Sequence, residues 1–154
     1  MRRKEREINN IAEIEDIITA CDVCRIAMVN NNIPYIVTLN FGYVGVEKPH
    51  MFFHCATEGR KLDMIRNNNF VCFEMDTDHK IYGGKKGCDW GMKYKSVMGY
   101  GRVIFVDSRD EKIAGLNHIM NHYGGSGAYS YDEEELARTL VLRFDISEMS
   151  GKRK

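Results

Sequence analysis

The feature that most constrains the fold is a run of three asparagines, Asn30–Asn32, between two segments of strand-like composition. β-branched and aromatic residues are concentrated in residues 23–29 and 34–41 on either side, and these residue types favour strands. Asparagine tolerates positive φ and can cap its own backbone, so the run predicts a tight turn. Two strands joined by so short a turn run antiparallel. We therefore expect a β-hairpin over residues 23–41.

Further segments extend this pattern. Strands are predicted over residues 51–56, 70–75, 94–106 and 139–146, and helices over residues 10–20, 59–66 and 108–122. Asn10 and Ser108, each followed three residues later by glutamate, mark two of the helix starts, and Gly99 and Gly101 indicate a bulge or bend in the long strand. Six strands with three interspersed helices fit a small antiparallel barrel, whereas a Rossmann-type dinucleotide fold is disfavoured.

The polar segment from Asp76 to Met92 is expected to be a loop. It contains Gly83, Gly84 and Gly87, and its length is typical of functional loops. Trp90 and Tyr94 border it, and they are either packed at an interface or a stacking surface for a flat ligand.

Composition excludes some classes of function. The 154 residues suffice for one domain, residues 1–154, and 22 basic residues balance 22 acidic ones. A nucleic-acid partner is therefore not expected, and neither is a membrane span, because no apolar run approaches the roughly 18 residues required. Together with five cysteines, an odd number, this favours a cytoplasmic protein. The basic clusters at residues 2–4 and 152–154 are read as solvated termini, or alternatively as a tether for an anionic partner.

The segment from Met51 to Lys61 carries the main functional signal. A strand-like run stops at small and polar residues, and a helical pattern follows Gly59-Arg60-Lys61. The first N–H groups of a helix lack partners within it and carry partial positive charge. With two cations beside them, they can hold a phosphate. The alternative is an ordinary strand-to-helix turn whose basic residues are merely solvated.

Two other patterns have weaker readings. Cys21 and Cys24 have the spacing of half a zinc site or a redox pair, but small core cysteines are the preferred interpretation. His118 and His122 have i, i+4 spacing, which suits a shared metal, yet a half-exposed helix face accounts for them better. No metal site is expected.

Several segments taken in order resemble a known family. They are Pro34–Tyr43 (PYIVTLNFGY), Phe53-His54-x-Ala56-x-x-Gly59-Arg60-Lys61, Val71–Glu74, and Tyr94-x-Ser96-Val97-x-Gly99-x-Gly101-Arg102. Together they resemble the flavin-binding split-barrel superfamily related to pyridoxamine 5'-phosphate oxidase, and within it the nitroimidazole-resistance type. The resemblance runs from about Met1 to Asp145. Thr38 departs from it, because the family often has proline there.

The resemblance implies a mainly β protein with helices, built as a six-stranded antiparallel split β-barrel. It implies a homodimer that binds FMN at the interface, with FAD less favoured. Phosphate contacts would come from Gly59, Arg60 and Lys61. The remaining cofactor contacts would come from Thr38, Leu39, Asn40, His54, Cys55, Ala56, Ser96 and Val97.

The resemblance also implies an activity. We expect an FMN-dependent oxidoreductase that passes electrons from a donor such as a nicotinamide nucleotide to a small acceptor. That acceptor could be a nitroimidazole or another nitro-aromatic. His54 is the candidate catalytic residue, because an imidazole titrates near neutral pH; the alternative for His54 is a hydrogen-bonded structural histidine. The alternative function is a flavin- or heme-binding module without turnover.

Overall fold

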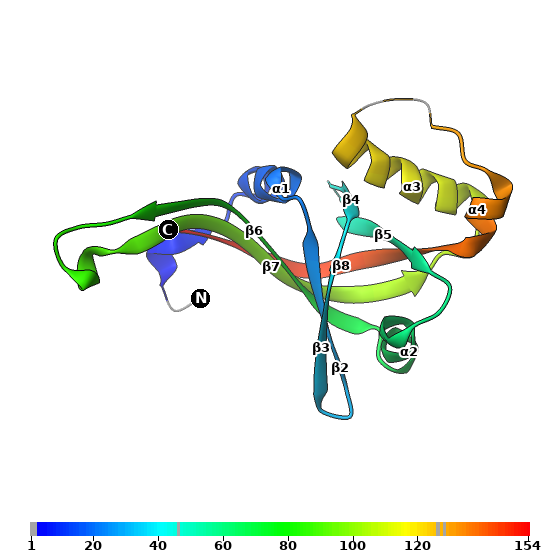
Figure 1. Cartoon of the computed structure of the whole chain (residues 1–154), viewed down its shortest axis with the longest axis horizontal. Helices are drawn as coiled ribbons and strands as arrows, with labels where there is room; N and C mark the ends of the chain where they lie inside the picture. Colours follow the sequence, from blue (N-terminus) through cyan, green and yellow to red (C-terminus); the bar gives the residue numbers. More distant parts are fainter. Residues whose placement is uncertain (1–2, 46, 126, 128) are drawn as a thin grey trace.

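The computed structural model describes residues 3–45, 47–125, 127 and 129–154. Arg2 of the N-terminal basic cluster lies outside these residues, as does Ser126 in the segment Gly124-Gly125-Ser126-Gly127, which its composition predicts to be a loop. The elements in chain order are η1 Lys4–Arg6, β1 Glu7–Ile8, α1 Ile11–Ala20, β2 Cys24–Asn30, β3 Ile33–Leu39, β4 Phe41–Val44, β5 His50–Ala56, α2 Arg60–Asn67, β6 Phe70–Tyr82, η2 Gly87–Asp89, β7 Gly91–Phe105, α3 Arg109–Gly124, α4 Glu133–Arg138 and β8 Thr139–Arg153 (Figure 1).

The strands form one antiparallel sheet that curves without closing. Its order is β3-β2-β6-β7-β8-β5-β4, and β1 pairs with β8. The expected mainly β fold with a split barrel is confirmed, but the expected count of six strands is wrong, because the described chain has eight. One extra strand, β1, is too short to show a sequence pattern. The other arises at Asn40, where the chain leaves β2 as a partner and pairs with β5 instead.

The concave side of the sheet encloses the main core. Alternate residues of the strands point inward and are almost fully buried, among them Phe41, Phe53, Phe73, Val97, Leu142 and Phe144. Cys21 and Cys24 belong to this core. Burial raises the pKa of Cys21 to about 12 and raises the pKa of Cys24 as well. The reading of these thiols as small core residues is therefore confirmed.

The expected loop over residues 76–92 is wrong. β6 and β7 continue through it as a two-stranded arm that projects beyond the barrel, with η2 near its tip (Figure 1). Residues 78–82 are exposed. Because most of the arm's residues face solvent, the alternation of apolar and polar residues that reveals a half-buried strand is missing.

The C-terminal basic cluster is solvent-exposed at Arg153 and Lys154, as expected, but it belongs to a strand rather than to a free tail. β8 runs to Arg153, seven residues beyond the expected end at Ile146. Lys152 lies over the Tyr94 ring at 5.3 Å, and Arg153 forms an ion pair with Glu13. Lys154 exchanges two backbone hydrogen bonds with Tyr94. The sequence pattern ends early because residues 147–154 are mostly polar or charged, and only Met149 and the buried Gly151 among them pack against the core.

Helix α3 covers the convex side of β4 and β5. Phe52, Val106, Ile119 and Val141 form a second, smaller core there. The His118 ring stacks on Phe52 at 5.7 Å, while the His122 Nε2 lies 2.9 Å from the Cys21 carbonyl oxygen. The two imidazoles therefore have separate partners. Helix α4 was not expected, because its six residues are too few to show periodicity. Among the described residues, no helix combines the length and apolar character needed to cross a bilayer.

Because α3 packs closely on β4, adding a methyl group at Gly42 should destabilise the fold. A Cβ there would lie 2.4 Å from the His118 carbonyl carbon and 2.4 Å from the Ile119 nitrogen. We expect Gly42→Ala to lower the free energy of unfolding by about 1–3 kcal/mol, measured by urea denaturation. Gly87→Ala is the control, because a Cβ at Gly87 meets no atom within 4 Å. Equal stability of the two variants would contradict the packing.

His118 predicts a pH dependence of stability. Burial, and secondarily the proximity of His50, lowers the pKa of His118 below its ordinary value of 6.5. Below pH 6.5, His118 is therefore protonated more readily in the unfolded chain than in the folded chain. The free energy of unfolding falls as the pH decreases. We expect the loss of unfolding free energy between pH 7.5 and 5 to be smaller in His118→Gln than in the wild type. Equal losses would show that His118 does not contribute.

Candidate functional site

The corner between β5 and α2 is open and lacks a capping side chain. β5 ends at Ala56, and Gly59 occupies the N-cap of α2 with φ of 131°, a conformation that favours glycine. Among the described residues, no side chain caps the first turn of α2 with a hydrogen bond. A Cβ at Gly59 would meet no atom within 4 Å. The backbone at this corner is thus free to be approached by a ligand, which is the requirement for an anion site at a helix N-terminus.

Two cations extend from the first turn of α2 towards different strands. The Arg60 guanidinium lies 4.6 Å from the centre of the Tyr35 ring on β3. Lys61 lies near Cys55 on β5, where its charge partly offsets the burial that raises the pKa of the Cys55 thiol. Neither cation forms an ion pair among the described residues, whereas Arg66, at the far end of α2, pairs with Asp63 at 3.1 Å. The sequence-predicted phosphate residues Gly59, Arg60 and Lys61 are therefore brought together.

The other predicted residues on β3 and β5 lie along strand edges. Thr38 is exposed on the convex face, Leu39 packs partly against the core, and Asn40 is exposed where the chain passes from β3 to β4. Of the β5 residues, His54 and Ala56 are exposed and Cys55 is half-buried. No hydrogen bond or ion pair to the His54 ring occurs in the described part of the chain. That ring is free to contact a ligand.

Ser96 and Val97 are not brought to the corner within one chain. The Val97 side chain is fully buried in the core, so only its backbone can meet a ligand. Ser96 lies opposite Asp76 on the convex face. Strands β2 and β6 separate β7 from β3, which puts Ser96 roughly 14 Å from β3 at the usual strand spacing.

A charged cluster on the convex face was not anticipated. Arg25 pairs with Glu74 at 3.1 Å and also with Asp76, whose second oxygen lies 2.5 Å from the His79 Nε2. Arg25 also faces Thr38 across the β2–β3 ladder. Burial, and then Asp76, raises the pKa of Glu74. Alternation could have shown that Arg25 and Glu74 point outward, but only the register of β2 against β6 brings them together.

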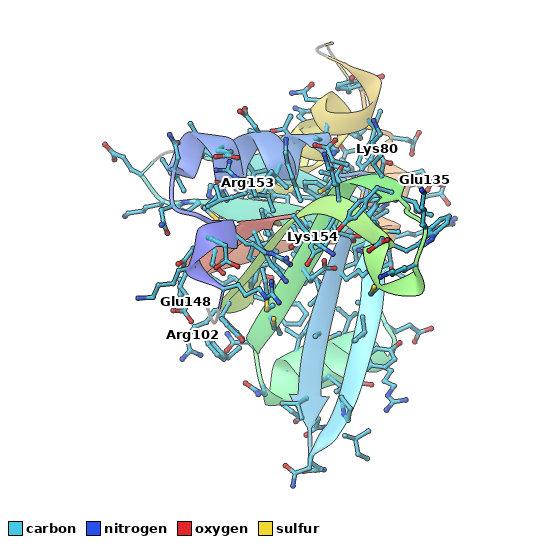
Figure 2. All side chains as sticks on the ribbon, turned by 90° about the vertical axis from the view of Figure 1, so that its left-hand side faces the viewer. Lys80, Arg102, Glu135, Glu148, Arg153 and Lys154 are labelled. Atoms are coloured by element: carbon cyan, nitrogen blue, oxygen red, sulfur yellow. The ribbon has the colours of Figure 1, made fainter. Side chains whose placement is uncertain are left out.

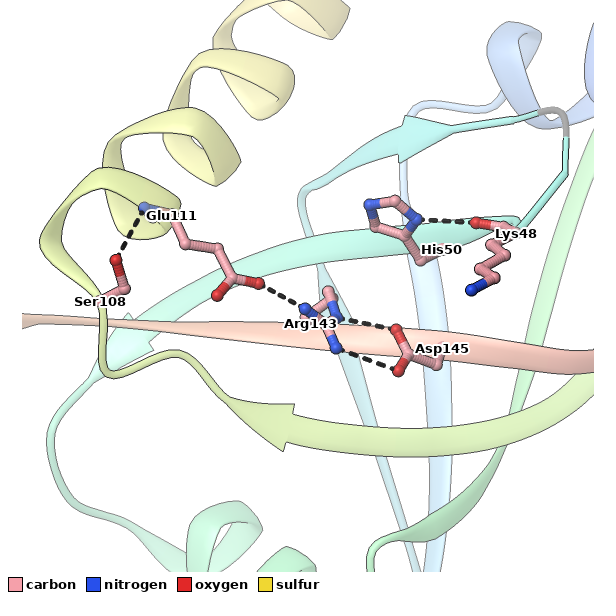
Figure 3. Close-up of polar contacts among 6 residues, drawn as sticks. All are labelled: Lys48, His50, Ser108, Glu111, Arg143 and Asp145. Atoms are coloured by element: carbon pink, nitrogen blue, oxygen red, sulfur yellow. Dashed lines mark hydrogen bonds and ion pairs between the residues drawn. The ribbon is translucent and has the colours of Figure 1, made fainter.

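A second hollow lies where β5 begins, at the opposite end of this strand from the corner. It measures about 680 Å³ and is lined partly by His50, Glu111, Arg143 and Asp145. Arg143 donates to Glu111 at 2.6 Å and to both oxygens of Asp145, and the His50 Nδ1–H donates to the Lys48 carbonyl oxygen at 2.8 Å (Figure 3). Because two carboxylates already neutralise Arg143, this hollow is a less suitable anion site than the corner.

Comparison with known proteins identifies a family and solved structures that this chain resembles. Residues 10–153 match the family model described as pyridoxamine 5'-phosphate oxidase. A structure from Bacteroides thetaiotaomicron, provisionally described as a 5-nitroimidazole antibiotic resistance protein, is 30% identical. The match covers 96% of this chain and 86% of that one, with a TM-score of 0.84. No curated protein sequence matches significantly.

Two more distant structures share the fold. A flavocytochrome from Azotobacter vinelandii is 15% identical, with a TM-score of 0.83 over 100% of this chain and 72% of that one. An FAD- and heme-binding protein from Mycobacterium smegmatis is 16% identical, with a TM-score of 0.83 over 97% and 73% of the two chains. The family model spans nearly the whole chain, and this protein therefore belongs to the pyridoxamine 5'-phosphate oxidase family.

Proposed function

We propose that this protein is a homodimeric, FMN-dependent oxidoreductase that reduces a small acceptor, with nitro-aromatic compounds as the leading class. The observation that carries the proposal is the uncapped N-terminus of α2 with Arg60 and Lys61 in its first turn. Proteins of similar fold are described as binding FAD, one of them together with heme, which supports a flavin ligand.

The corner fits a terminal phosphate. Free N–H groups at the start of α2 and two unpaired cations complement a phosphate dianion, and the open space above Gly59 leaves room for close approach. FMN carries both charges of its phosphate at one end of the molecule, which matches two cations on adjacent residues. FAD spreads its charge over a pyrophosphate and continues past the corner. This match is our reason for preferring FMN.

The edges of β3 and β5 would hold the flavin ring. Thr38, Leu39 and Asn40 offer backbone groups on one side, and His54, Cys55 and Ala56 lie at the end of β5 on the other. When bound, FMN supplies reversible two-electron chemistry that the side chains themselves cannot perform. The exposed imidazole of His54 would hold a proton and donate it to the acceptor, as a general acid does.

Homodimerisation is proposed from the convex face of the sheet. Large apolar side chains are exposed to solvent on this face, and Ile36 among them is 63% exposed. A contiguous surface of this kind on a small protein marks an interaction site. In a dimer packed on this face, Ser96 of one copy could reach the ring held by the other. The other large apolar side chains exposed there are Val29, Phe70, Met98 and Tyr100.

The alternative is a flavin- or heme-binding module without turnover. Two proteins of similar fold support this alternative. One is described as a flavocytochrome and the other as an FAD- and heme-binding protein. The discriminating measurement is oxidation of a nicotinamide nucleotide in the presence of FMN and a nitroimidazole. Turnover supports the enzyme, whereas heme uptake without turnover supports the module.

The phosphate assignment predicts the effect of removing both cations. Arg60→Ala combined with Lys61→Ala should weaken FMN binding by about 100-fold, because two charge-assisted contacts are lost. Flavin fluorescence quenching measures the affinity. Arg66→Ala, on the same helix but paired with Asp63, should bind FMN like the wild type. Wild-type affinity in the double variant would show that the phosphate lies elsewhere.

The role of His54 predicts a separation of binding from turnover. His54→Asn should lower the rate of nitro-aromatic reduction by about 100-fold, the usual contribution of a positioned acid, while changing FMN affinity little. The pH dependence of kcat should also change, because the proton donor is lost. An unchanged rate and pH profile would make His54 a structural residue.

A further inference from the structure

The arm formed by β6 and β7 breaks a rule of strand pairing. Lys80 and Lys93 are direct partners in the ladder, so two like charges face each other on one side of the ribbon, an arrangement that destabilises a sheet. Lys95 is neutralised by Asp78 at 3.0 Å. Lys80, Lys85, Lys86 and Lys93 have no carboxylate within ion-pair distance among the described residues. The arm therefore carries a cluster of uncompensated positive charge.

The arm also exposes large apolar side chains. Ile81 is 67% exposed and Trp90 is 61% exposed, and the Trp90 ring packs against Gly83. Figure 2 looks along the molecule from this end, and Lys80 is labelled in it. A two-stranded ribbon is marginally stable in water. Exposed charge and apolar surface together indicate that a partner covers the arm.

The opposite end of the molecule carries the complementary charge. Asp107, Asp110 and Glu135 are exposed there and have no ion-pair partner in the described part of the chain. Nearby, Glu133 and Glu134 pair with Arg109 and Arg138. A shallow hollow of about 190 Å³ is lined by Asp107, Arg109, Lys112, Glu133, Ala137 and the buried Leu136. The acidic character of this end therefore comes from the carboxylates that are unpaired among the described residues, Asp107, Asp110 and Glu135.

The two ends lie at opposite extremes of the long axis (Figure 1). A two-fold axis perpendicular to that axis would place the arm of one copy beside the acidic end of the other, and it would do so twice. We propose that the arm of each protomer docks on the end formed by α3 and α4 of its partner, as a reciprocal electrostatic clamp. This rests on the homodimer of the proposed function and specifies which surfaces meet.

The charge balance favours a second copy over a nucleic acid. The chain has equal numbers of basic and acidic residues, so the long-range attraction of a polyanion to the arm is opposed by repulsion from the acidic end. Two copies in antiparallel orientation bring opposite charges together at both ends. The separation of positive and negative charge at the two ends of the chain therefore weakens binding to a polyanion and favours self-association.

The test is the dimer dissociation constant, measured by sedimentation velocity at low salt. Lys80→Glu with Lys93→Glu should weaken the dimer at least ten-fold. Adding Asp107→Lys and Glu135→Lys to the same chain should restore it. Lys4→Glu with Lys48→Glu is the control, because both lysines are exposed elsewhere, and it should leave the dimer intact. High salt should weaken the wild type more than the lysine variant.

A neutral variant separates docking from folding of the arm. Lys80→Gln with Lys93→Gln removes the repulsion within the ribbon, so the arm should remain folded while the dimer weakens. A wild-type dimer that none of these changes affects would overturn the clamp but not the homodimer. A monomeric wild type would overturn both. The lysine variant could instead keep the wild-type dimer dissociation constant and lose an affinity for duplex DNA that the wild type has. That result would assign the arm to nucleic acid and would also overturn the clamp.

Discussion

The pairing of β8 with both β5 and β7 is the constraint on which the rest of the structure depends. β8 forms the ladder that holds β5 from His50 to Ala56, and on its other side it pairs with β7 over most of its length. Leu142 and Phe144 on this strand are fully buried in the main core, while Val141 is buried on the opposite face beneath α3. The strand thus joins both cores and fixes where β5 ends. The position of the ligand corner follows from that end point.

Charge is distributed so that each region has a distinct role. At the corner, Arg60 and Lys61 form no ion pair with any described residue, whereas Arg143 is held by Glu111 and Asp145. Because a guanidinium held by two carboxylates gains little from another anion, the corner is better suited to a phosphate than the hollow at the start of β5. The positive arm and the acidic end formed by α3 and α4 balance within one chain. That balance explains why a net charge of zero conceals strongly charged surfaces.

Local patterns predicted most of the barrel strands and the strand-to-helix corner at Gly59, because both depend on neighbours in sequence. The turn at Asn31 and Asn32 has the positive φ that asparagine tolerates, and Gly59 lies at the N-cap of α2 as its position suggested. The arm was missed because its residues face solvent. The change of partner at Asn40 and the contact of Arg25 with Glu74 were missed because they depend on register between distant strands, which no local pattern encodes.

We propose that the N-terminus of α2 binds the phosphate of a flavin. The most direct test compares the affinities of FMN and riboflavin for the wild-type protein by isothermal titration, because the two ligands share the ring and differ only in the phosphate. We expect FMN to bind at least 100-fold more tightly, as two charge-assisted contacts would require. Equal affinities, or no binding of either ligand, would contradict it.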